Sequence, residues 1–373
     1  MKEEVMADLL EFPTKLHADR KIIHVDMDAF YAQIEMRDHP EYQNVPIILA
    51  RDPRKTGGHG VVATANYMAR KQGVHSAMSA AEALKLAPEA TFVPPNFSLY
   101  REVSTQVHQV FHQLTDKIEP IAFDEAYLDL SDYEQDPVML AHWLQQTIYQ
   151  QLTLTSSVGI SFNKFLAKLA SEHNKPAGLT VVRPEDIRDF LDPLPIEAIR
   201  GVGQKTAVKM HDLSINTARD LYKQSLATLE EHFGRLGFTL FKRIRGVDER
   251  PVQWQRQRKS IGKEHTFTHF IDGDQAVLTE LRSLAHELVL TLQRKDQHGK
   301  TLVLKVRDDR FETRTHRRTG PDFIRNDERM IQQLAQDIWE DMGGYERPIR
   351  LLGLTMTNLQ PVTFTEMPLN LYE

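Results

Sequence analysis

Short apolar, β-branched runs alternate with stretches of helical periodicity along the first half of the chain. This alternation predicts a sheet covered by helices. The expected strands are 21–30, 45–50, 61–65, 122–131 and 157–160, and the expected helices are 66–72, 99–114, 138–154 and 162–178. Pro176 and Gly178 are expected to stop the last of these helices.

Two linkers divide the second half of the chain. A proline-rich hinge at 183–195 precedes a helical stretch, and a second linker at about 248–259 leads to a final segment. In that segment we expect helices at 275–294 and 326–342 and strands at 302–309, 311–317 and 350–359. Strands mixed with two helices predict a small α+β sandwich layer. Residues 1–19 are expected to form a short amphipathic or frayed extension.

Length and composition limit the class of protein. With 373 residues, two to four domains are expected at about 100–200 residues each. No stretch approaches the ~18–20 apolar residues of a membrane span. The acidic first residues lack the basic region of a secretory signal. The absence of cysteine excludes disulfides, a thiol nucleophile and cysteine-bound metals, and favours a reducing cytoplasm.

The distribution of charge along the chain leads to a different conclusion from the net charge. A net charge of −6 argues by itself against a nucleic-acid partner. Residues 250–318, however, carry 15 basic and 9 acidic side chains, a net charge of +6. A basic block in an acidic chain indicates a region that binds a polyanion. A merely solvated charged face remains the alternative.

Two acidic clusters accompany apolar strands: Asp26 with Asp28, and Asp124 with Glu125. Buried carboxylates need neutralisation, and side-chain alternation would place Asp26 and Asp28 on one face, with Met27 on the other. Oxygens converging from two strands favour hard divalent ions and two-metal phosphoryl or nucleotidyl transfer. The alternative is that both clusters are solvent-facing strand ends.

Basic and hydroxyl side chains supply candidate phosphate ligands. Tyr67 and Arg70 are three residues apart on an expected helix and share a face, where Arg can bind phosphate in a bidentate manner. Three lysines recur through the helix at 162–178 and its end: Lys164, Lys168 and Lys175. Lys175 lies past the periodic apolar run, where a cation can reach a ligand. An exposed, solvated Arg is the alternative at position 70.

The segment IRGVGQKTAVKM, residues 199–210, has the signature of a helix–hairpin–helix motif. Gly201 and Gly203 form a turn that presents backbone N–H groups to a DNA phosphate, followed by Lys205. A plain connection between two helices also uses glycine and remains possible on this evidence.

Four ordered motifs together resemble the Y-family, or lesion-bypass, DNA polymerases. They are HVDMDAFYAQIEMRD (24–38), VVATANYMARKQGV (61–74), FDEAYLDLS (123–131) and NKFLAKLASEHNKPAG (163–178). The resemblance covers about residues 20 to 360 and implies an α+β right-hand architecture. It implies a palm at 20–29 and 98–184, fingers at 30–97, a thumb with the helix–hairpin–helix at 185–250, a linker at 251–259, a little finger at 260–360 and a tail at 361–373.

The resemblance also implies roles for individual residues. Asp26, Asp124 and Glu125 would hold two Mg²⁺ ions, completed by the backbone carbonyl of Met27, and Asp28 would have a supporting role. Tyr31 matches the steric gate against ribonucleotides. The triphosphate would be bound by the Phe30 N–H and by the side chains of Thr64, Tyr67, Arg70 and Lys175, while Val61 would cover the incoming base pair. The chain departs from the family in reading NKPAG where NKPNG is more usual.

The function implied is template-directed DNA synthesis for translesion synthesis in DNA repair. The resemblance implies a distributive, error-prone, cytoplasmic, monomeric polymerase that takes primer–template DNA and dNTPs, without a membrane partner. The basic block at 250–318 would contact duplex backbone without sequence preference.

The segment MPLNLYE, residues 367–373, resembles the peptide through which bacterial polymerases bind the sliding clamp. Leu369, Leu371 and Tyr372 match its apolar anchors, but Pro368 stands where Gln is usual, which predicts reduced affinity. A terminus with chance hydrophobic residues is the alternative.

Three other classes of protein explain the motifs less well. A metal-dependent phosphatase would share the Asp-x-Asp pattern but would want a hydroxyl residue where Ala29, Phe30 and Tyr31 stand. A nucleotide cyclase would need neither the phosphate-binding hairpin nor the basic block. A DNA-binding protein without catalysis would have no use for the acidic triad.

Overall fold

The structure is a computed structural model that describes residues 16–345 and 347–362. The chain forms two compact units, which divide between Arg256 and Gln257 and are described separately. Of the expected N-terminal extension, residues 1–15 lie outside the described residues. Within the described ranges, no helix has the length and apolar character that crossing a membrane requires.

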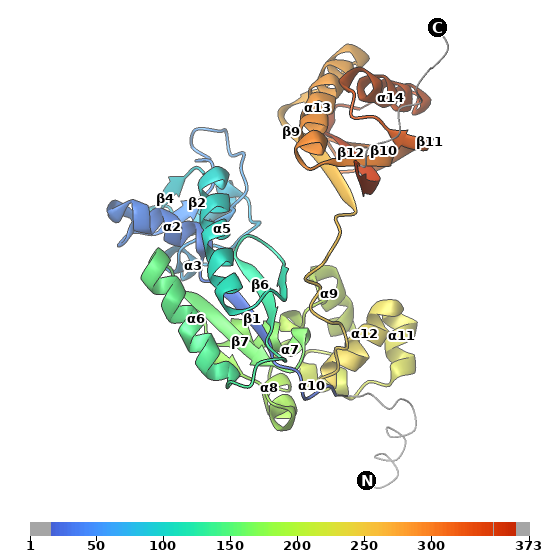
Figure 1. The fold of residues 1–373 in the computed structure, drawn as a ribbon. Coiled ribbons are helices and arrows are strands. Elements are labelled where there is room, and N and C mark those ends of the chain that lie inside the picture. Colours follow the sequence, from blue (N-terminus) through green and yellow to red (C-terminus); the bar gives the residue numbers. More distant parts are fainter. Residues whose placement is uncertain (1–15, 346, 363–373) are drawn as a thin grey trace, which may run out of the picture. The chain divides into compact units, whose positions relative to one another are not determined.

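A five-stranded sheet forms the centre of the first unit, in the order β5–β6–β1–β7–β8 (Figure 1). Its strands are β1 (Ile22–Met27), β5 (Ile118–Pro120), β6 (Glu125–Asp129), β7 (Ser156–Ser161) and β8 (Leu179–Val181). β1 lies antiparallel between β6 and β7, and its register pairs Asp26 with Glu125 on one side and Ser157 on the other. The middle of the sheet therefore brings the two predicted acidic clusters together.

Side-chain alternation along β1 assigns its residues to two different layers. Ile23, Val25 and Met27 pack in a core with helices α5 (Phe97–Leu114) and α6 (Pro137–Leu152). On the other face, the side chains of His24 and Asp26 contact α7 (Lys164–His173). The helix expected over 162–178 thus begins after the Asn163 cap and ends at His173, and Pro176 and Gly178 belong to the turn that follows.

A smaller sheet in the order β3–β2–β4 follows β1 in the chain. It consists of β2 (Ile47–Leu49), β3 (Thr64–Ala65) and β4 (Thr91–Val93), with helices α2 (Phe30–Asp38), α3 (Tyr67–Arg70) and α4 (Ala80–Leu86). The strand predicted at 61–65 is shorter than expected, because Val61 instead forms an isolated bridge to Ser79.

The remainder of the first unit is helical. Its helices are α8 (Ile187–Leu191), α9 (Gln204–Asp212), α10 (Ala218–Tyr222), α11 (Leu226–Phe233) and α12 (Arg235–Ile244). The prediction of a simple hinge at 183–195 was wrong in its middle, where α8 forms. Ile187 and Leu191 are buried in the helical core, so tertiary packing overrides the proline-rich composition there.

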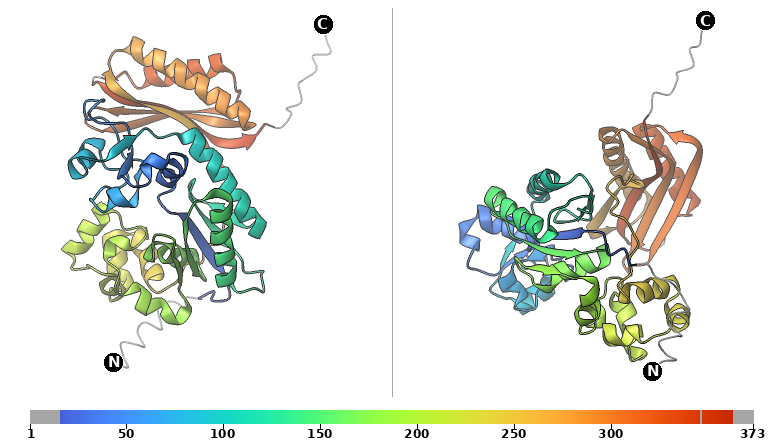
Figure 2. Two further views of the ribbon diagram at one scale, coloured as in Figure 1. Left: turned by 90° about the vertical axis from the view of Figure 1, so that its left-hand side faces the viewer. Right: turned by 60° about the horizontal axis from the view of Figure 1, so that its bottom comes forward.

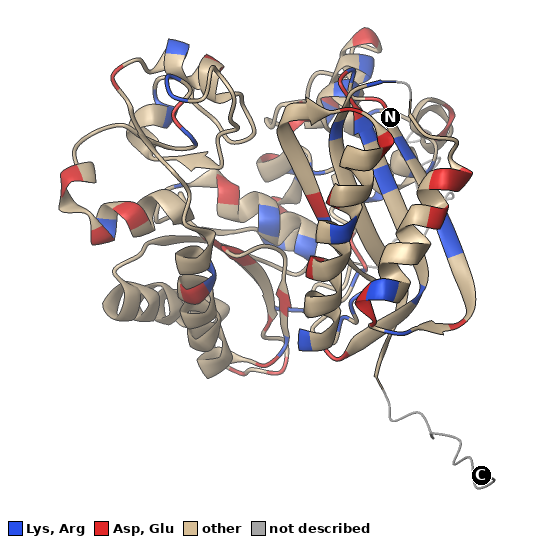
Figure 3. Ribbon diagram, turned by 90° about the horizontal axis from the view of Figure 1, so that it is seen from above, with Lys and Arg blue, Asp and Glu red and all other residues tan. Residues whose placement is uncertain are grey.

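The second unit is a four-stranded antiparallel sheet, ordered β11–β10–β12–β9, with two helices on one face (Figure 2). Its elements are β9 (Ser260–Ile271), α13 (Asp274–Arg294), β10 (Gln297–Asp308), β11 (Thr313–Ile324), α14 (Glu328–Asp341) and β12 (Ile349–Pro361). Strand β9 was missed in the sequence, because Ile261 is its one buried residue and no apolar run marks the strand. Lys and Arg recur along the strands of this unit (Figure 3).

Strand β7 and helix α7 pack so closely at Gly159 that a substitution there tests their packing. A Cβ added at Gly159 would lie 2.0 Å from the Ala167 carbonyl oxygen and 2.3 Å from the Ser171 nitrogen. We expect Gly159→Ala to lower the free energy of unfolding by about 3 kcal/mol, because both clashes are with backbone. Gly203→Ala is the matched control, since a Cβ there meets nothing within 4 Å. Denaturant unfolding of the two variants measures the difference, and equal stability would contradict the packing described.

Candidate active site

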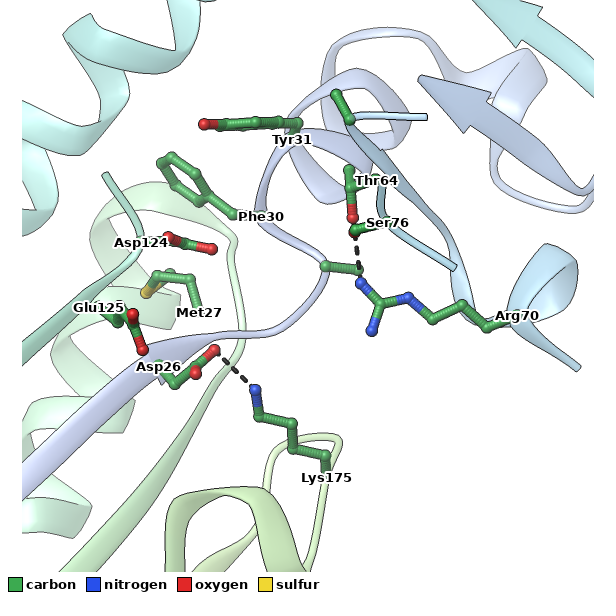
Figure 4. Close-up of a pocket in the computed structure, with 12 residues that line it drawn as sticks. Asp26, Met27, Phe30, Tyr31, Thr64, Arg70, Ser76, Asp124, Glu125 and Lys175 are labelled. Carbon is green, nitrogen blue, oxygen red and sulfur yellow. Dashed lines mark hydrogen bonds and ion pairs between the residues drawn. The ribbon is translucent and has the colours of Figure 1, made fainter. Parts of the chain in front are cut away.

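Three carboxylates meet where β1 and β6 lie side by side. Asp26 and Glu125 are direct partners in the sheet, and the Met27 N–H donates to the Asp124 carbonyl over 2.9 Å. All three acids and Met27 line a cavity of about 320 Å³ (Figure 4). The predicted convergence of oxygens from two strands is therefore present in the fold.

Two lysines lie against this acidic cluster. Lys168 Nζ is 2.9 Å from Asp26 Oδ2 and 2.6 Å from Glu125 Oε2, and it also contacts Glu172. Lys175 Nζ is 2.7 Å from Asp26 Oδ1, so each oxygen of Asp26 faces an ammonium group. The nearby carboxylates raise the pKa of Lys168 although its burial opposes this. Lys175 was predicted from the sequence to reach the site, whereas Lys168 was noted without a role.

Glu125 and Asp124 differ in their pKa values. Burial opposes ionisation of Glu125, but hydrogen bonds from His24 and Lys168 together with the Lys168 charge lower its pKa to about 2. Burial, followed by the charges of Asp26 and Glu125, raises the pKa of Asp124 to about 6. The cluster thus carries negative charge that the two lysines do not fully neutralise. Oxygen ligands with such excess charge fit a hard divalent cation.

His24 is a site residue that the sequence analysis missed. It is fully buried, its Nδ1 lies 2.8 Å from Ser171 Oγ, and its Nε2 lies 3.3 Å from Glu125 Oε2. Burial lowers the pKa of His24, so the ring is a neutral support for Glu125. Ligand atoms of His24, Asp26 and Glu125 lie within 4.8 Å of one another. His24 stands two residues before Asp26 on β1, so strand alternation places both side chains on the same face, and this spacing was the signal that the sequence offered.

A polar wall faces the carboxylates across the cavity. Thr64, Arg70 and Ser76 line it, and an Arg70 terminal nitrogen donates to Thr64 Oγ1 over 3.0 Å (Figure 4). Arg70 Nε also donates to the Ala65 carbonyl over 2.9 Å, which fixes the side chain beside the cavity. The structure therefore brings Thr64 and Arg70 together as predicted and adds Ser76, for which the sequence offered no signal.

The structure places Tyr67 differently from the expectation. The Arg70 guanidinium lies 5.3 Å from the Tyr67 ring, so the two share a face as predicted. The Tyr67 hydroxyl, however, is 3.4 Å from Asp28 Oδ1, and its ring lines a separate, largely apolar pocket with Met36 and Pro176. Tyr67 is not among the described residues that line the acidic cavity.

Phe30 and Tyr31 open helix α2 at the edge of the cavity (Figure 4). The Tyr31 ring stacks on Tyr100 with a centroid distance of 4.3 Å and an angle of 13°, and it meets Phe97 edge-on. Tyr100 is itself held by a 2.6 Å hydrogen bond to Glu35 Oε1. These contacts fix the plane of Tyr31 at the cavity.

Asp28 does not share the face of Asp26, contrary to the alternation argument. The strand ends at Met27, and Ala29 has a φ of 42°, so the chain turns before period two can continue. Asp28 is buried and accepts hydrogen bonds from Ser157, Thr155 and the Ala177 N–H instead.

The remaining predicted residues lie elsewhere in the chain. Gly201 has a φ of 109°, and Gly203 is the N-cap of α9, which contains Lys205. This is the tight turn followed by a helix that the motif predicts. Val61 is 64% exposed. The tail residues Leu369, Leu371 and Tyr372 lie outside the described residues.

Three family models match successive parts of the chain. The model of the impB/mucB/samB family matches residues 25–172, the DNA polymerase-iota thumb domain matches 197–248, and the impB/mucB/samB family C-terminal domain matches 258–369. Together they cover most of the chain and most of the candidate site, while His24 and Lys175 lie just outside the matched ranges.

Curated relatives and solved structures agree with these matches. The chain is 46% identical over 355 residues to DNA polymerase IV of Streptococcus thermophilus, covering 94% of this chain and 96% of the relative. It is 45% identical to DNA polymerase IV of Streptococcus pyogenes serotype M5, with 94% and 97% coverage. Among solved structures, a Y-family DNA polymerase chimera of Dbh and Dpo4 matches with a TM-score of 0.80 and 28% identity, covering 91% of this chain and 98% of the chimera.

A structure titled as an insertion ternary complex of Dbh DNA polymerase matches with a TM-score of 0.67 and 28% identity, with the same coverage. The Y-family resemblance read from the four sequence motifs is thereby confirmed, together with the mixed α+β fold. The chain belongs to the impB/mucB/samB family, the Y-family of DNA-directed DNA polymerases.

Proposed function

We propose that this polymerase adds dNTPs to a primer 3′-OH by two-metal nucleotidyl transfer, with Mg²⁺ as the metal. The observation that carries the proposal is the convergence of Asp26, Asp124 and Glu125 in one cavity that Arg70 and Lys175 also line. Acidic metal ligands beside basic phosphate ligands are the set of groups that nucleotidyl transfer requires.

Asp26, Asp124 and Glu125 would hold the ions, with the Met27 carbonyl as a further ligand. Bound divalent ions supply activation of the 3′-hydroxyl and neutralisation of the departing pyrophosphate. His24 supports Glu125 from the buried side, where it contacts Oε2. Lys168 provides the positive charge that allows Asp26 and Glu125 to lie together within the sheet.

The triphosphate would lie between the carboxylates and the wall formed by Thr64 and Arg70. Arg70 is held at this wall by its bonds to Thr64 and Ala65, so it offers its remaining N–H groups at little entropic cost. Lys175 would exchange its contact with Asp26 for the triphosphate, and the Phe30 N–H would join it. The Tyr67 hydroxyl would complete the set only after leaving Asp28 and turning toward the cavity. Charged donors fixed in this way stabilise the charge that develops during transfer.

We propose that different domains of the chain contact different parts of the DNA. We assign the palm to 20–29 and 98–184, the fingers to 30–97, the thumb to 185–250 and the little finger to 260–360. The Gly201–Gly203 turn with Lys205 would bind a backbone phosphate, and the basic block would contact the duplex. Contacts limited to phosphates carry no sequence information, which suits a polymerase that copies any template. We further propose that synthesis is distributive and error-prone, and that the enzyme acts in translesion synthesis as a cytoplasmic monomer.

Primer extension on undamaged and damaged templates tests this function. With each of the four dNTPs supplied alone and then together, we expect Mg²⁺-dependent, template-directed addition that continues opposite a lesion. Dilution of the enzyme with excess template should shorten the products if synthesis is distributive. Failure to extend with either Mg²⁺ or Mn²⁺ would contradict the proposal.

The segment 367–373 gives a separate prediction about a protein partner. We propose that Leu369, Leu371 and Tyr372 bind the bacterial sliding clamp, because they match the apolar anchors of its peptide ligand. Deletion of 367–373 should leave extension without clamp unchanged and remove stimulation by the cognate clamp. Full stimulation of the truncated protein would exclude this segment as the contact, and Pro368→Gln should strengthen the stimulation.

A further inference from the structure

Asp28 is a buried carboxylate whose partners come from three separate segments. Its Oδ2 accepts from Thr155 Oγ1 and from the Ala177 N–H, each over 2.8 Å. Its Oδ1 accepts from Ser157 Oγ over 2.6 Å and lies 3.4 Å from the Tyr67 hydroxyl. Asp28 is 1% exposed, and all four of these donors are neutral.

The bond to Ala177 reaches the turn that carries Lys175. This turn joins α7 to β8, and it is tight: a Cβ at Gly178 would lie 1.9 Å from the Asn174 carbonyl oxygen. Lys175 projects from the turn into the acidic cavity, where its Nζ meets Asp26 (Figure 4). The position of the Lys175 backbone therefore depends on what holds residues 174–178.

Ala177 makes this turn conformationally costly. Its φ is 55°, in the left-handed region that Gly adopts freely, Asn adopts more readily than other residues, and Ala disfavours because of its Cβ. The side chain of Ala offers no polar group to hold the turn from within. The hydrogen bond from its N–H to Asp28 is thus an external restraint on an unfavourable backbone conformation.

We propose that Asp28 is a positioning residue for the dNTP triphosphate, and that Ala177 makes this chain depend on it. Asp28 holds the turn 174–178 through the Ala177 N–H and so places Lys175. The inference rests on the proposed function, in which Lys175 binds the triphosphate. It predicts that the need for Asp28 falls when residue 177 itself favours a positive φ.

The test measures dNTP binding without turnover. A primer ending in a dideoxynucleotide is annealed to a template containing 2-aminopurine, and dNTP is titrated in Mg²⁺. Asp28→Asn should raise the dNTP dissociation constant about tenfold, as expected for loss of a charge-assisted hydrogen bond, and leave primer–template affinity unchanged. Asp28→Asn with Ala177→Asn should recover most of that loss, and Ala177→Asn alone should bind dNTP like the parent.

Further variants separate the possible failures. Lys175→Ala tests the proposed function: if it leaves dNTP binding unchanged, the triphosphate assignment itself fails. If Lys175→Ala weakens binding but Asp28→Asn does not, only the role of Asp28 is overturned. The role of Asp28 would also be overturned if Asp28→Asn weakened dNTP binding and Ala177→Asn did not restore it. Asp28 would then affect dNTP binding by some route other than the turn 174–178.

A folding defect in Asp28→Asn would be detected by thermal unfolding. In that case Thr155→Val carries the same test, because the Thr155 hydroxyl donates to the oxygen that binds Ala177. Thr155→Val should weaken dNTP binding by a smaller factor than Asp28→Asn, and Ala177→Asn should restore the dNTP binding of Thr155→Val. An unchanged dNTP dissociation constant in folded Thr155→Val, or no restoration, would overturn the proposal.

Discussion

Replacement of either acid at the start of β6 is expected to abolish synthesis. Asp124→Asn and Glu125→Gln should each lower the rate of primer extension by about a thousandfold. In the proposed mechanism, removal of a carboxylate charge weakens binding of the ions that would activate the 3′-hydroxyl and neutralise the pyrophosphate. Primer–template affinity should stay near normal or increase, because less negative charge then faces the DNA phosphates. Single-turnover extension and a DNA-binding titration measure the two effects separately.

Asp116→Asn is the matched control for these variants. The Asp116 side chain is 91% exposed and pairs with His112 on the surface, so its neutralisation should change extension little. A folded Asp124→Asn or Glu125→Gln protein that extends within threefold of the parent would remove that residue from the set of metal ligands. Loss of DNA binding together with extension would instead indicate a structural role.

The second large effect is expected at Tyr31. Tyr31→Ala should raise the efficiency of ribonucleotide incorporation by about a hundredfold relative to dNTP incorporation, because a fixed ring under the sugar leaves no room for a 2′-hydroxyl. The stack on Tyr100 and the edge contact with Phe97 hold this ring in one plane. Tyr31→Phe keeps the ring and should keep the discrimination.

A packing role for Tyr31 makes a different prediction. Loss of a ring that stacks on Tyr100 would lower the free energy of unfolding by about 2 kcal/mol without a change in sugar selectivity. Steady-state incorporation of each rNTP and dNTP, measured beside thermal unfolding, distinguishes the two. Unchanged selectivity in a folded Tyr31→Ala protein would exclude the gate.

Local patterns predicted those elements whose sequence carries a strong period. The apolar run of β1 and the helical spacing of α5 and α6 locate these elements to within a few residues. Strand β9 shows the opposite case, because its side chains are mostly exposed and its pairing with β12 supplies the order that its composition does not. Helix α8 forms in a proline-rich segment because Ile187 and Leu191 reach a core built by distant residues.

The residues of the candidate site likewise divide into those that local patterns predicted and those that only the fold revealed. The acids of β1 and β6, Arg70, Lys175 and the helix–hairpin–helix turn were predictable, since their chemistry lies in short motifs and their side chains reach the site from motif positions. His24, Ser76 and Lys168 were not assigned roles. Beyond the period-two spacing of His24 from Asp26, nothing local distinguishes these residues until the fold brings His24 and Lys168 against Glu125 and Ser76 to the cavity.

The sequence by itself determined the family and predicted the candidate metal-binding carboxyl groups and the elements that carry them, because these depend on residue type and spacing along one strand or helix. The tertiary structure alone decided where Asp28 points, which groups neutralise Asp26 and Glu125, and that Tyr67 faces Asp28 and not the cavity. Each of these depends on where the chain turns after a strand ends and on which distant segment packs there. Contacts of that kind join residues from 39 positions apart, for Asp28 with Tyr67, to 149 positions apart, for Asp28 with Ala177, and no local period encodes them.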